Sequence, residues 1–184
     1  DLATLSKSPR DLYKAQTLTD KTLSDVAAMQ VNDLQFTQTD GSWMLTDDPD
    51  YPVSQSSIKK MAGTILQMQT VWTVTAPEAD TVYGLDSPDV TAVLTFTDGT
   101  SLTVRFGNAV AAAADGSDGD SLCYLASDAA PTVVYEVNAD SKLAYAVTKD
   151  SLSEETATAE TAASDPVAQY PVGGEDDYAD SLPE

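Results

Sequence analysis

The sequence predicts an α+β domain in which antiparallel β-hairpins and a meander pack against one main α-helix, with a short second helix. Two observations predict this class. Short apolar runs are separated by Asp40-Gly41 and by Asp98-Gly99, and an Asp-Gly pair between such runs indicates a hairpin because the turn needs positive φ. From Ser54 onward, apolar residues instead recur every three or four positions, which is the period of an amphipathic helix.

The first expected element is a three-stranded meander over residues 26–45. Its apolar runs are Val26, Met29 and Val31, then Leu34 and Phe36, then Trp43 and Leu45. Asn32-Asp33 and Asp40-Gly41 separate the runs. The following segment contains Pro49 and Pro52. Proline lacks the backbone N–H that a strand interior needs, so we expect the meander to end before these residues.

The best helix of the chain is expected next, with the Ser54 hydroxyl as its N-cap. The face that it would bury against the sheet consists of Ile58, Met61, Ala62, Ile65 and Met68. Residues 79–83 then predict one short helical turn. Gly84 would close this turn, because glycine adopts the left-handed conformation at a helix end, and Pro88 would prevent its continuation.

The second half of the domain is expected to contain two more hairpins and the short second helix. Apolar residues alternate on both sides of Asp98-Gly99, at Ala92, Leu94 and Phe96 and then at Leu102, Val104 and Phe106. Residues 121–126 and 132–137 predict the last hairpin. Asp140 or Ser141 can cap the short helix, which would carry Leu143, Ala144 and Val147.

Charge divides the chain into three expected parts. The sequence holds 30 acidic and 9 basic residues and no His, for a net charge of -21. Residues 1–23 are expected to be a leader or linker, residues 24–150 a single α+β domain, and residues 151–184 an acidic, flexible C-terminal tail. The tail has few apolar residues to offset its ordering entropy. Docking of Val167, Tyr170 and Val172 as an extra strand is the alternative for this segment.

Several classes of partner are not expected. A nucleic-acid binder neutralises phosphates with a basic face, which a chain this acidic does not predict. The only adjacent basic pair is Lys59-Lys60, so a polybasic membrane-binding patch is not expected. Direct membrane insertion is not expected either, because the longest apolar run, at residues 109–114, is far shorter than the roughly 18 residues of a spanning helix.

The residue inventory also limits the chemistry. Without His, the chain lacks the usual general base at neutral pH and the commonest transition-metal ligand. The single Cys123 cannot form an internal disulfide, and we expect it to be a buried small residue. Ser56 and Lys59 match the Ser-x-x-Lys spacing of penicillin-recognising enzymes. The accompanying motifs are absent, so solvent-facing side chains at a helix start are the favoured interpretation, and no catalytic residue is assigned.

The remaining candidates for chemistry are acidic and aromatic residues. Asp115, Asp118 and Asp120 lie in a Gly-rich loop and are the candidate ligands of a calcium ion, although their spacing departs from that of an EF-hand. Asp47, Asp48 and Asp50 are a weaker candidate of the same kind. Carboxylate pairs for glycoside hydrolysis need a cleft floored by aromatics. Trp43 and Trp72 are the large aromatics, and core anchors are the favoured interpretation of both.

One family resemblance is carried by two segments. The strand Gly41-Ser42-Trp43-Met44-Leu45 and the turn Tyr83-Gly84-Leu85-Asp86-Ser87-Pro88 resemble those of domain-of-unknown-function family 4340 (DUF4340), over about residues 24–150. The resemblance implies an exported or lipoprotein-type bacterial domain behind an N-terminal anchor that is absent from this chain, and some relatives lie near transporter components linked to gliding. It implies no catalytic residues.

The sequence therefore predicts a non-catalytic extracytoplasmic binding or assembly module of a bacterial cell envelope, which would be displayed at the cell surface or secreted. Its partner would be another envelope protein. Two alternatives remain open. One is an envelope enzyme, or enzyme accessory, that uses carboxylates. The other is an adhesion or stalk domain stiffened by calcium.

Overall fold

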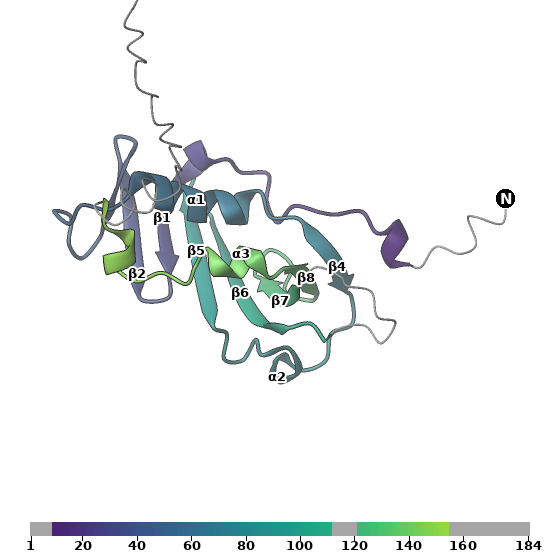
Figure 1. The fold of residues 1–184 in the computed structure, drawn as a ribbon. Helices are drawn as coiled ribbons and strands as arrows, with labels where there is room; N and C mark the ends of the chain where they lie inside the picture. The colour runs from purple at the N-terminus through teal and green to yellow at the C-terminus, as the bar shows by residue number, and fades with distance from the viewer. Residues whose placement is uncertain (1–8, 112–120, 155–184) are drawn as a thin grey trace, which may run out of the picture.

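The structure is a computed structural model, and it describes residues 9–111 and 121–154 (Figure 1). An eight-stranded sheet with antiparallel neighbours has the order β3-β2-β1-β5-β6-β7-β8-β4, and helices accompany it, so the predicted α+β class is confirmed. The strands are β1 (Val26–Val31), β2 (Leu34–Thr39), β3 (Ser42–Leu45), β4 (Thr70–Val74), β5 (Val90–Phe96), β6 (Ser101–Ala109), β7 (Leu122–Ser127) and β8 (Val134–Asn138). The α-helices are α1 (Gln55–Leu66), α2 (Asp80–Tyr83) and α3 (Asp140–Leu143), and the 3-10 turns are η2 (Arg10–Leu12), η3 (Leu23–Asp25) and η4 (Asp150–Leu152).

The two Asp-Gly turns differ in geometry. Between β2 and β3, Asp40 and Gly41 both have positive φ, 52° and 82°, as a two-residue hairpin turn with matching twist requires. Between β5 and β6, Gly99 has a φ of 83° and Asp98 is not in the left-handed region. The Asp98 carboxylate instead accepts hydrogen bonds from the backbone N–H and the hydroxyl of Thr100, at 2.9 and 2.6 Å. This second loop is therefore held by a side chain.

Helix α1 lies across one face of the sheet, which we call the α1 face (Figure 1). Its N-cap is Ser54, whose hydroxyl oxygen accepts from the Ser57 N–H at 3.3 Å. The helix buries Ile58, Met61, Ala62, Ile65 and Leu66. These side chains join the alternate residues of the central strands in one core, because successive strand residues point to opposite faces.

The segment after α3 completes this core in an unexpected way. Leu143, predicted as part of the apolar face, is 69% exposed, and α3 is only four residues long. Tyr145 is the buried residue, and its hydroxyl donates to the Met61 carbonyl oxygen at 2.7 Å. Burial, which disfavours the phenolate, raises the pKa of Tyr145 far above its ordinary value. The contact ties the end of the domain to α1.

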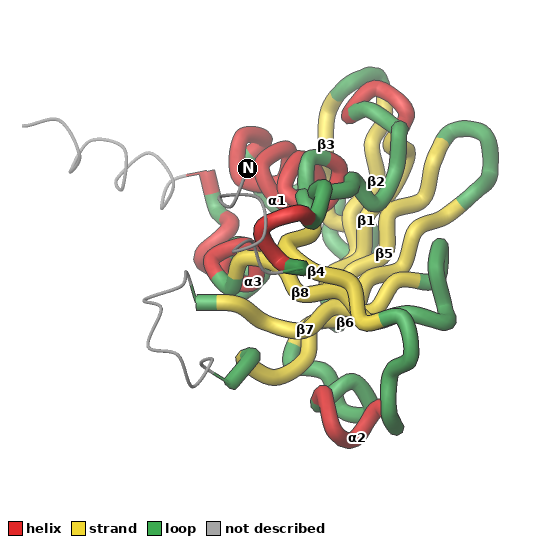
Figure 2. Tube along the Cα trace, turned by 90° about the vertical axis from the view of Figure 1, so that its right-hand side faces the viewer, coloured by secondary structure: helices red, strands yellow, loops and turns green. Residues whose placement is uncertain are grey.

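The opposite face of the sheet, which we call the outer face, carries α2. Figures 1 and 2 both place α2 well apart from α1. A second, smaller core forms under α2 from Tyr83, Leu85, Ala126 and Val134. Gly107 on β6 permits this approach, because a Cβ there would collide with the Tyr83 carbonyl oxygen. Gly84 ends α2 with a φ of 68°, as the sequence predicts.

Strand β4 is the element that the sequence does not predict. It follows α1 directly, yet it pairs with β8 at the far edge of the sheet, with Trp72 opposite Glu136. A local pattern cannot specify a partner that distant in the chain. The segment before η3 contacts β4 in turn, since the Thr70 N–H donates to the Gln16 carbonyl oxygen at 2.9 Å and Thr17 forms a bridge with Gln69.

The other edge strand, β3, is covered by a side chain. The Gln55 amide accepts from the Trp43 N–H at 2.7 Å and donates to the Trp43 carbonyl oxygen at 2.8 Å. The amide thereby replaces the backbone of a neighbouring strand. Exposed edges invite pairing with other chains, so Gln55 protects β3 from that pairing.

Candidate functional site

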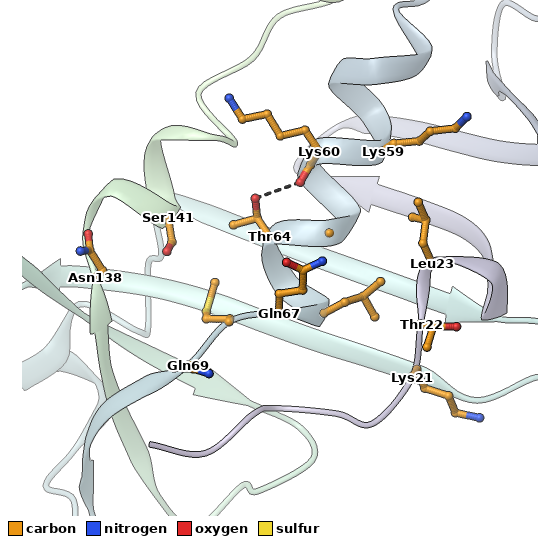
Figure 3. A pocket seen from close by; sticks show the side chains of 13 residues that line it. Lys21, Thr22, Leu23, Lys59, Lys60, Thr64, Gln67, Gln69, Asn138 and Ser141 are labelled. Carbon is orange, nitrogen blue, oxygen red and sulfur yellow. Dashed lines mark hydrogen bonds between the residues drawn. The ribbon is translucent and has the colours of Figure 1, made fainter. Parts of the chain in front are cut away.

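An open groove of about 740 Å³ lies beside the second half of α1 (Figure 3). We call it the α1 groove. In Figure 3 the helix runs down the middle, with Thr22 and Leu23 on one side and Asn138 and Ser141 on the other. Its lining comprises Lys21, Thr22, Leu23, Lys59, Lys60, Gly63, Thr64, Leu66, Gln67, Met68, Gln69, Asn138 and Ser141.

Four chain segments build the groove. The η3 turn supplies one wall, and it is fixed where the Thr22 N–H donates to the Asp25 carboxylate at 2.8 Å. This hydrogen bond is the main reason that the pKa of Asp25 is lowered. The end of α1 and the three residues that lead into β4 supply the floor, where Leu66 and Met68 are buried. The start of α3 supplies the second wall.

The lining of the groove is basic. Among the residues that the structure describes, it contains three lysines, Lys21, Lys59 and Lys60, and no Asp or Glu, in a chain with 30 acidic residues. Both Lys59 and Lys60 are exposed, and they extend from α1 toward opposite sides in Figure 3. Because no described carboxylate shares this lining with Lys59 and Lys60, an anionic ligand in the groove would meet positive charge.

Lys59 and Lys60 also differ from most basic residues of the described chain. Lys7 lies outside that part, and five of the eight remaining basic residues form ion pairs: Arg10, Lys21, Arg105, Lys142 and Lys149. Within residues 9–111 and 121–154, no carboxylate is paired with Lys14, Lys59 or Lys60. Two of these three unpaired lysines therefore line the same groove.

Lys21 is held in a fixed position by Asp98. The Lys21 ammonium donates to the Asp98 carboxylate, and this hydrogen bond is the largest cause that lowers the pKa of Asp98 and raises that of Lys21. Lys21 thus contributes a charge at the rim that is already partly neutralised. Lys59 and Lys60 carry the available positive charge.

A second hollow, of about 230 Å³, lies on the outer face. Its only basic group is Arg105, which donates to the Leu85 carbonyl oxygen at 2.7 Å and to the Asp80 carboxylate at 3.3 Å. These bonds connect α2 to β6. The charge in this smaller hollow is therefore used within the fold.

The two residues of the Ser-x-x-Lys match have different surroundings in the structure. The Ser56 hydroxyl lies 3.1 Å from the Ser54 hydroxyl, within the N-cap region, and Lys59 lines the groove. No hydrogen bond joins Ser56 and Lys59, although both belong to the described residues. A nucleophile needs its base within hydrogen-bond reach, so this geometry does not form a nucleophile and base pair.

The acidic candidates divide into two sets. Asp115, Asp118 and Asp120 lie outside the described residues. Asp48 forms an ion pair with Lys149 at 2.6 Å, and the Tyr51 hydroxyl donates to the Lys149 carbonyl oxygen at 3.2 Å. These contacts connect the segment before α1 to the segment before η4. In residues 9–111 and 121–154, no three acidic or cysteine side chains gather closely enough to hold a metal ion.

The remaining candidates are packing residues. Trp43 is 2% exposed in the main core, and its indole N–H has no hydrogen-bond partner. Cys123 is buried as predicted, and burial raises the pKa of its thiol. Trp72 lies on the outer face, where the Arg10 guanidinium sits 5.2 Å from its ring centre and the Tyr13 ring 5.4 Å away.

The sequence contained one signal for the groove. Lys59-Lys60 is the only adjacent basic pair, and it lies on the helix opposite the apolar stripe. The pair lines a groove only because Lys21, Gln69 and Asn138, which come from three other segments, lie near it. Only the tertiary arrangement brings these together.

Comparisons with protein-family models, with curated proteins and with solved structures find no match to this chain. Among the helices of residues 9–111 and 121–154, none has the length and apolar character that crossing a bilayer would require.

Proposed function

We propose that this chain is a non-catalytic binding or assembly module of a bacterial cell envelope, and that the α1 groove recognises an acidic polypeptide segment. The observation that carries the proposal is the composition of the groove: three lysines and, among the described residues, no carboxylate, in a chain with a net charge of -21. Protein surfaces that bind one another have complementary charge. A basic groove in an acidic protein therefore favours an acidic ligand.

The chemistry of the lining suits a peptide more than a small anion. Besides the lysines, the lining contains the amide side chains of Gln67, Gln69 and Asn138, which can hydrogen-bond to a peptide backbone. Leu66 and Met68 form an apolar floor. A combination of a few polar groups with an apolar floor is typical of a binding surface.

The location outside the cytoplasmic membrane, and the envelope protein as partner, are parts of the same proposal. They are supported by the resemblance of residues 41–45 and 83–88 to DUF4340 and by the acidic, Lys-poor composition of the chain. An N-terminal anchor would place the module at the cell surface, and the groove would then face other envelope proteins.

The test is a binding measurement with charge variants. A fluorescein-labelled 15-residue oligo-glutamate peptide is titrated with the full chain at low ionic strength, and fluorescence anisotropy gives the Kd. Lys59→Glu/Lys60→Glu should weaken binding by about 30-fold, because two attractive contacts of up to about 1 kcal/mol each become repulsive. Added salt should weaken the wild-type complex.

The matched control is Lys14→Glu beside the single variant Lys60→Glu. Lys14 is also exposed and unpaired within the described residues, but it lies outside the groove. Both substitutions change the net charge equally. The proposal expects a loss of affinity for Lys60→Glu and a change below twofold for Lys14→Glu. Equal losses would show general charge attraction and would contradict a groove-specific site.

A further inference from the structure

We infer that the α1 groove is occupied within the same chain by the acidic segment at residues 155–184, which a partner must displace. This inference rests on the proposed function, because it names the first acidic ligand that the groove would meet. It is supported by the charge of the segment, by the point where the described fold leads into it, and by the side chains beside its acidic run.

The charge of the segment is complementary to the groove. Residues 155–184 contain eight Asp and Glu residues and no Lys or Arg. Four of the eight occur within six residues, at Glu175, Asp176, Asp177 and Asp180. At Lys59 and Lys60 it would meet two exposed ammonium groups, one on each side of α1, that form no ion pair with a described carboxylate.

The described chain leads into the segment close to the groove. The N–H of Ser54, the N-cap of α1, donates to the Leu152 carbonyl oxygen at 2.7 Å. The Glu154 N–H donates to the Pro52 carbonyl oxygen at 2.8 Å. Glu154 therefore lies beside the first turn of α1. Lys59 and Lys60 lie five and six residues along that helix from Ser54, which is about 8–9 Å at 1.5 Å per residue.

The connection is long enough for the acidic run to reach the lysines. From Glu154 to Glu175 there are 21 residues, which span at most about 70 Å when extended. The distance to be covered is a small fraction of that reach. A tethered ligand on such a linker has an effective concentration on the order of millimolar. A weak intramolecular contact is then sufficient for high occupancy.

The residues around the acidic run fit the rest of the groove. Tyr178 follows Asp177 directly, and Leu182 follows two residues after Asp180. Either apolar side chain can cover the floor at Leu66 and Met68 while the carboxylates face the lysines. The segment thus supplies both kinds of group that the groove accepts.

The functional consequence is competition. While the segment occupies the groove, a partner with its own acidic region gains access only by displacing it. The apparent affinity for a partner is reduced by the fraction of molecules with a free groove. Loss or modification of the segment would therefore increase partner binding without any change in the groove itself.

The test uses the full chain and two variants that remove four negative charges each. The segment variant is Glu175→Gln/Asp176→Asn/Asp177→Asn/Asp180→Asn. The control variant is Asp33→Asn/Asp47→Asn/Asp50→Asn/Asp86→Asn, at four exposed body residues outside the groove. Backbone amide chemical shifts of Gly63, Thr64 and Gln67 report on the groove. We expect them to move in the segment variant and to stay within line width in the control.

Binding of the oligo-glutamate peptide gives a second readout. The segment variant should bind it at least fivefold more tightly than the wild type, and 0.5 M NaCl should remove the difference, because salt screens the contact. A synthetic peptide of residues 170–184, added to the segment variant, should restore the wild-type amide shifts. Lys59→Glu/Lys60→Glu, introduced into the segment variant, should prevent that restoration.

Two outcomes would overturn the inference, and they are distinguishable. If the segment variant changes neither the amide shifts nor the peptide affinity, and the peptide still binds through Lys59 and Lys60, the groove is a binding site that its own segment does not occupy. If the peptide binds neither wild type nor segment variant, the proposed function fails together with the inference.

Discussion

The two faces of the sheet are stabilised differently. The α1 face holds the main core, in which Phe36, Leu94 and Phe106 are at most 1% exposed. The outer face holds the small cluster under α2 and a set of charged and aromatic contacts around Glu136. Glu136 is buried, and both of its carboxylate oxygens accept from Arg10, at 2.6 and 2.8 Å.

The comparison shows where charge remains available for binding. On the outer face, Arg10 and Arg105 are both bonded to carboxylates within the fold. Beside the α1 face, apolar burial fixes the helix, so its surface lysines are not needed for that purpose. Lys59 and Lys60 are consequently exposed and unpaired in the described chain.

The largest expected effect compares an aromatic residue on each face. Phe106 packs in the main core with its ring 5.5 Å from that of Tyr145, and Phe106→Ala should destabilise the fold by about 3–5 kcal/mol. Tyr124 is only half-buried against Tyr83 on the outer face, so Tyr124→Ala should cost roughly 1–2 kcal/mol. Urea unfolding measures both. Equal losses would contradict the assignment of the main core to the α1 face.

The next effect is that replacing glycine with alanine should change the free energy of unfolding in opposite directions at two positions. Gly107→Ala places a methyl group against the Tyr83 carbonyl oxygen and should cost about 1–3 kcal/mol, since the backbone must shift. Gly63 lies in α1, and a methyl group added there would meet no atom within 4 Å. Gly63→Ala should therefore stabilise the fold by about 0.5–1 kcal/mol. Thermal and urea unfolding measure both changes. If the two environments were alike, both variants would be stabilised or both destabilised.

A smaller effect concerns the ion pair of the outer face. Arg10 is half-exposed while Glu136 is 4% exposed, so solvent screens one partner and the coupling should be about 1 kcal/mol. A double-mutant cycle with Arg10→Met, Glu136→Gln and the double variant measures it. Because Arg10→Met alone leaves a buried carboxylate without this partner, it should cost more than the double variant. If the stability losses of the two single variants add up to the loss of the double variant, the Arg10–Glu136 ion pair does not contribute to stability.

The smallest effect is the acid response of the β5–β6 turn. Hydrogen bonds from Lys21 and Thr100 lower the pKa of Asp98 in the folded state. A depressed carboxyl pKa stabilises the fold fully above the unfolded-state value of about 3.9, and the contribution is lost as the pH falls from there through the lower folded-state pKa. Asp98→Asn should therefore cost more stability at pH 7 than at pH 2. An equal loss of stability at both pH values would contradict this origin.

Much of the fold follows from local patterns in the sequence. The apolar spacing from Ile58 to Ile65 and the Ser54 cap predict α1, because periodicity and capping are properties of neighbouring residues. The glycine at position 84 predicts the end of α2 for the same reason. These features need no knowledge of distant contacts.

The unpredicted features depend on tertiary structure. Strand β4 has a suitable composition, but its pairing with β8 is decided by the route of the chain after α1. Likewise, the α1 groove combines Lys59 and Lys60 with Lys21 and Asn138, and no spacing rule relates these positions. The acidic loop that suggested calcium binding, at Asp115, Asp118 and Asp120, lies outside the described residues and stays a prediction.

The central claim is that the α1 groove, and not the outer face, is the recognition surface. The most direct test is a map of backbone amide shifts during titration of the full chain with the oligo-glutamate peptide. The account predicts saturable shifts at Gly63, Thr64, Gln67 and Gln69, and none at Trp72, Arg105 or Ala126 on the outer face. Shifts centred on the outer face, or no saturable shift at any residue, would contradict it.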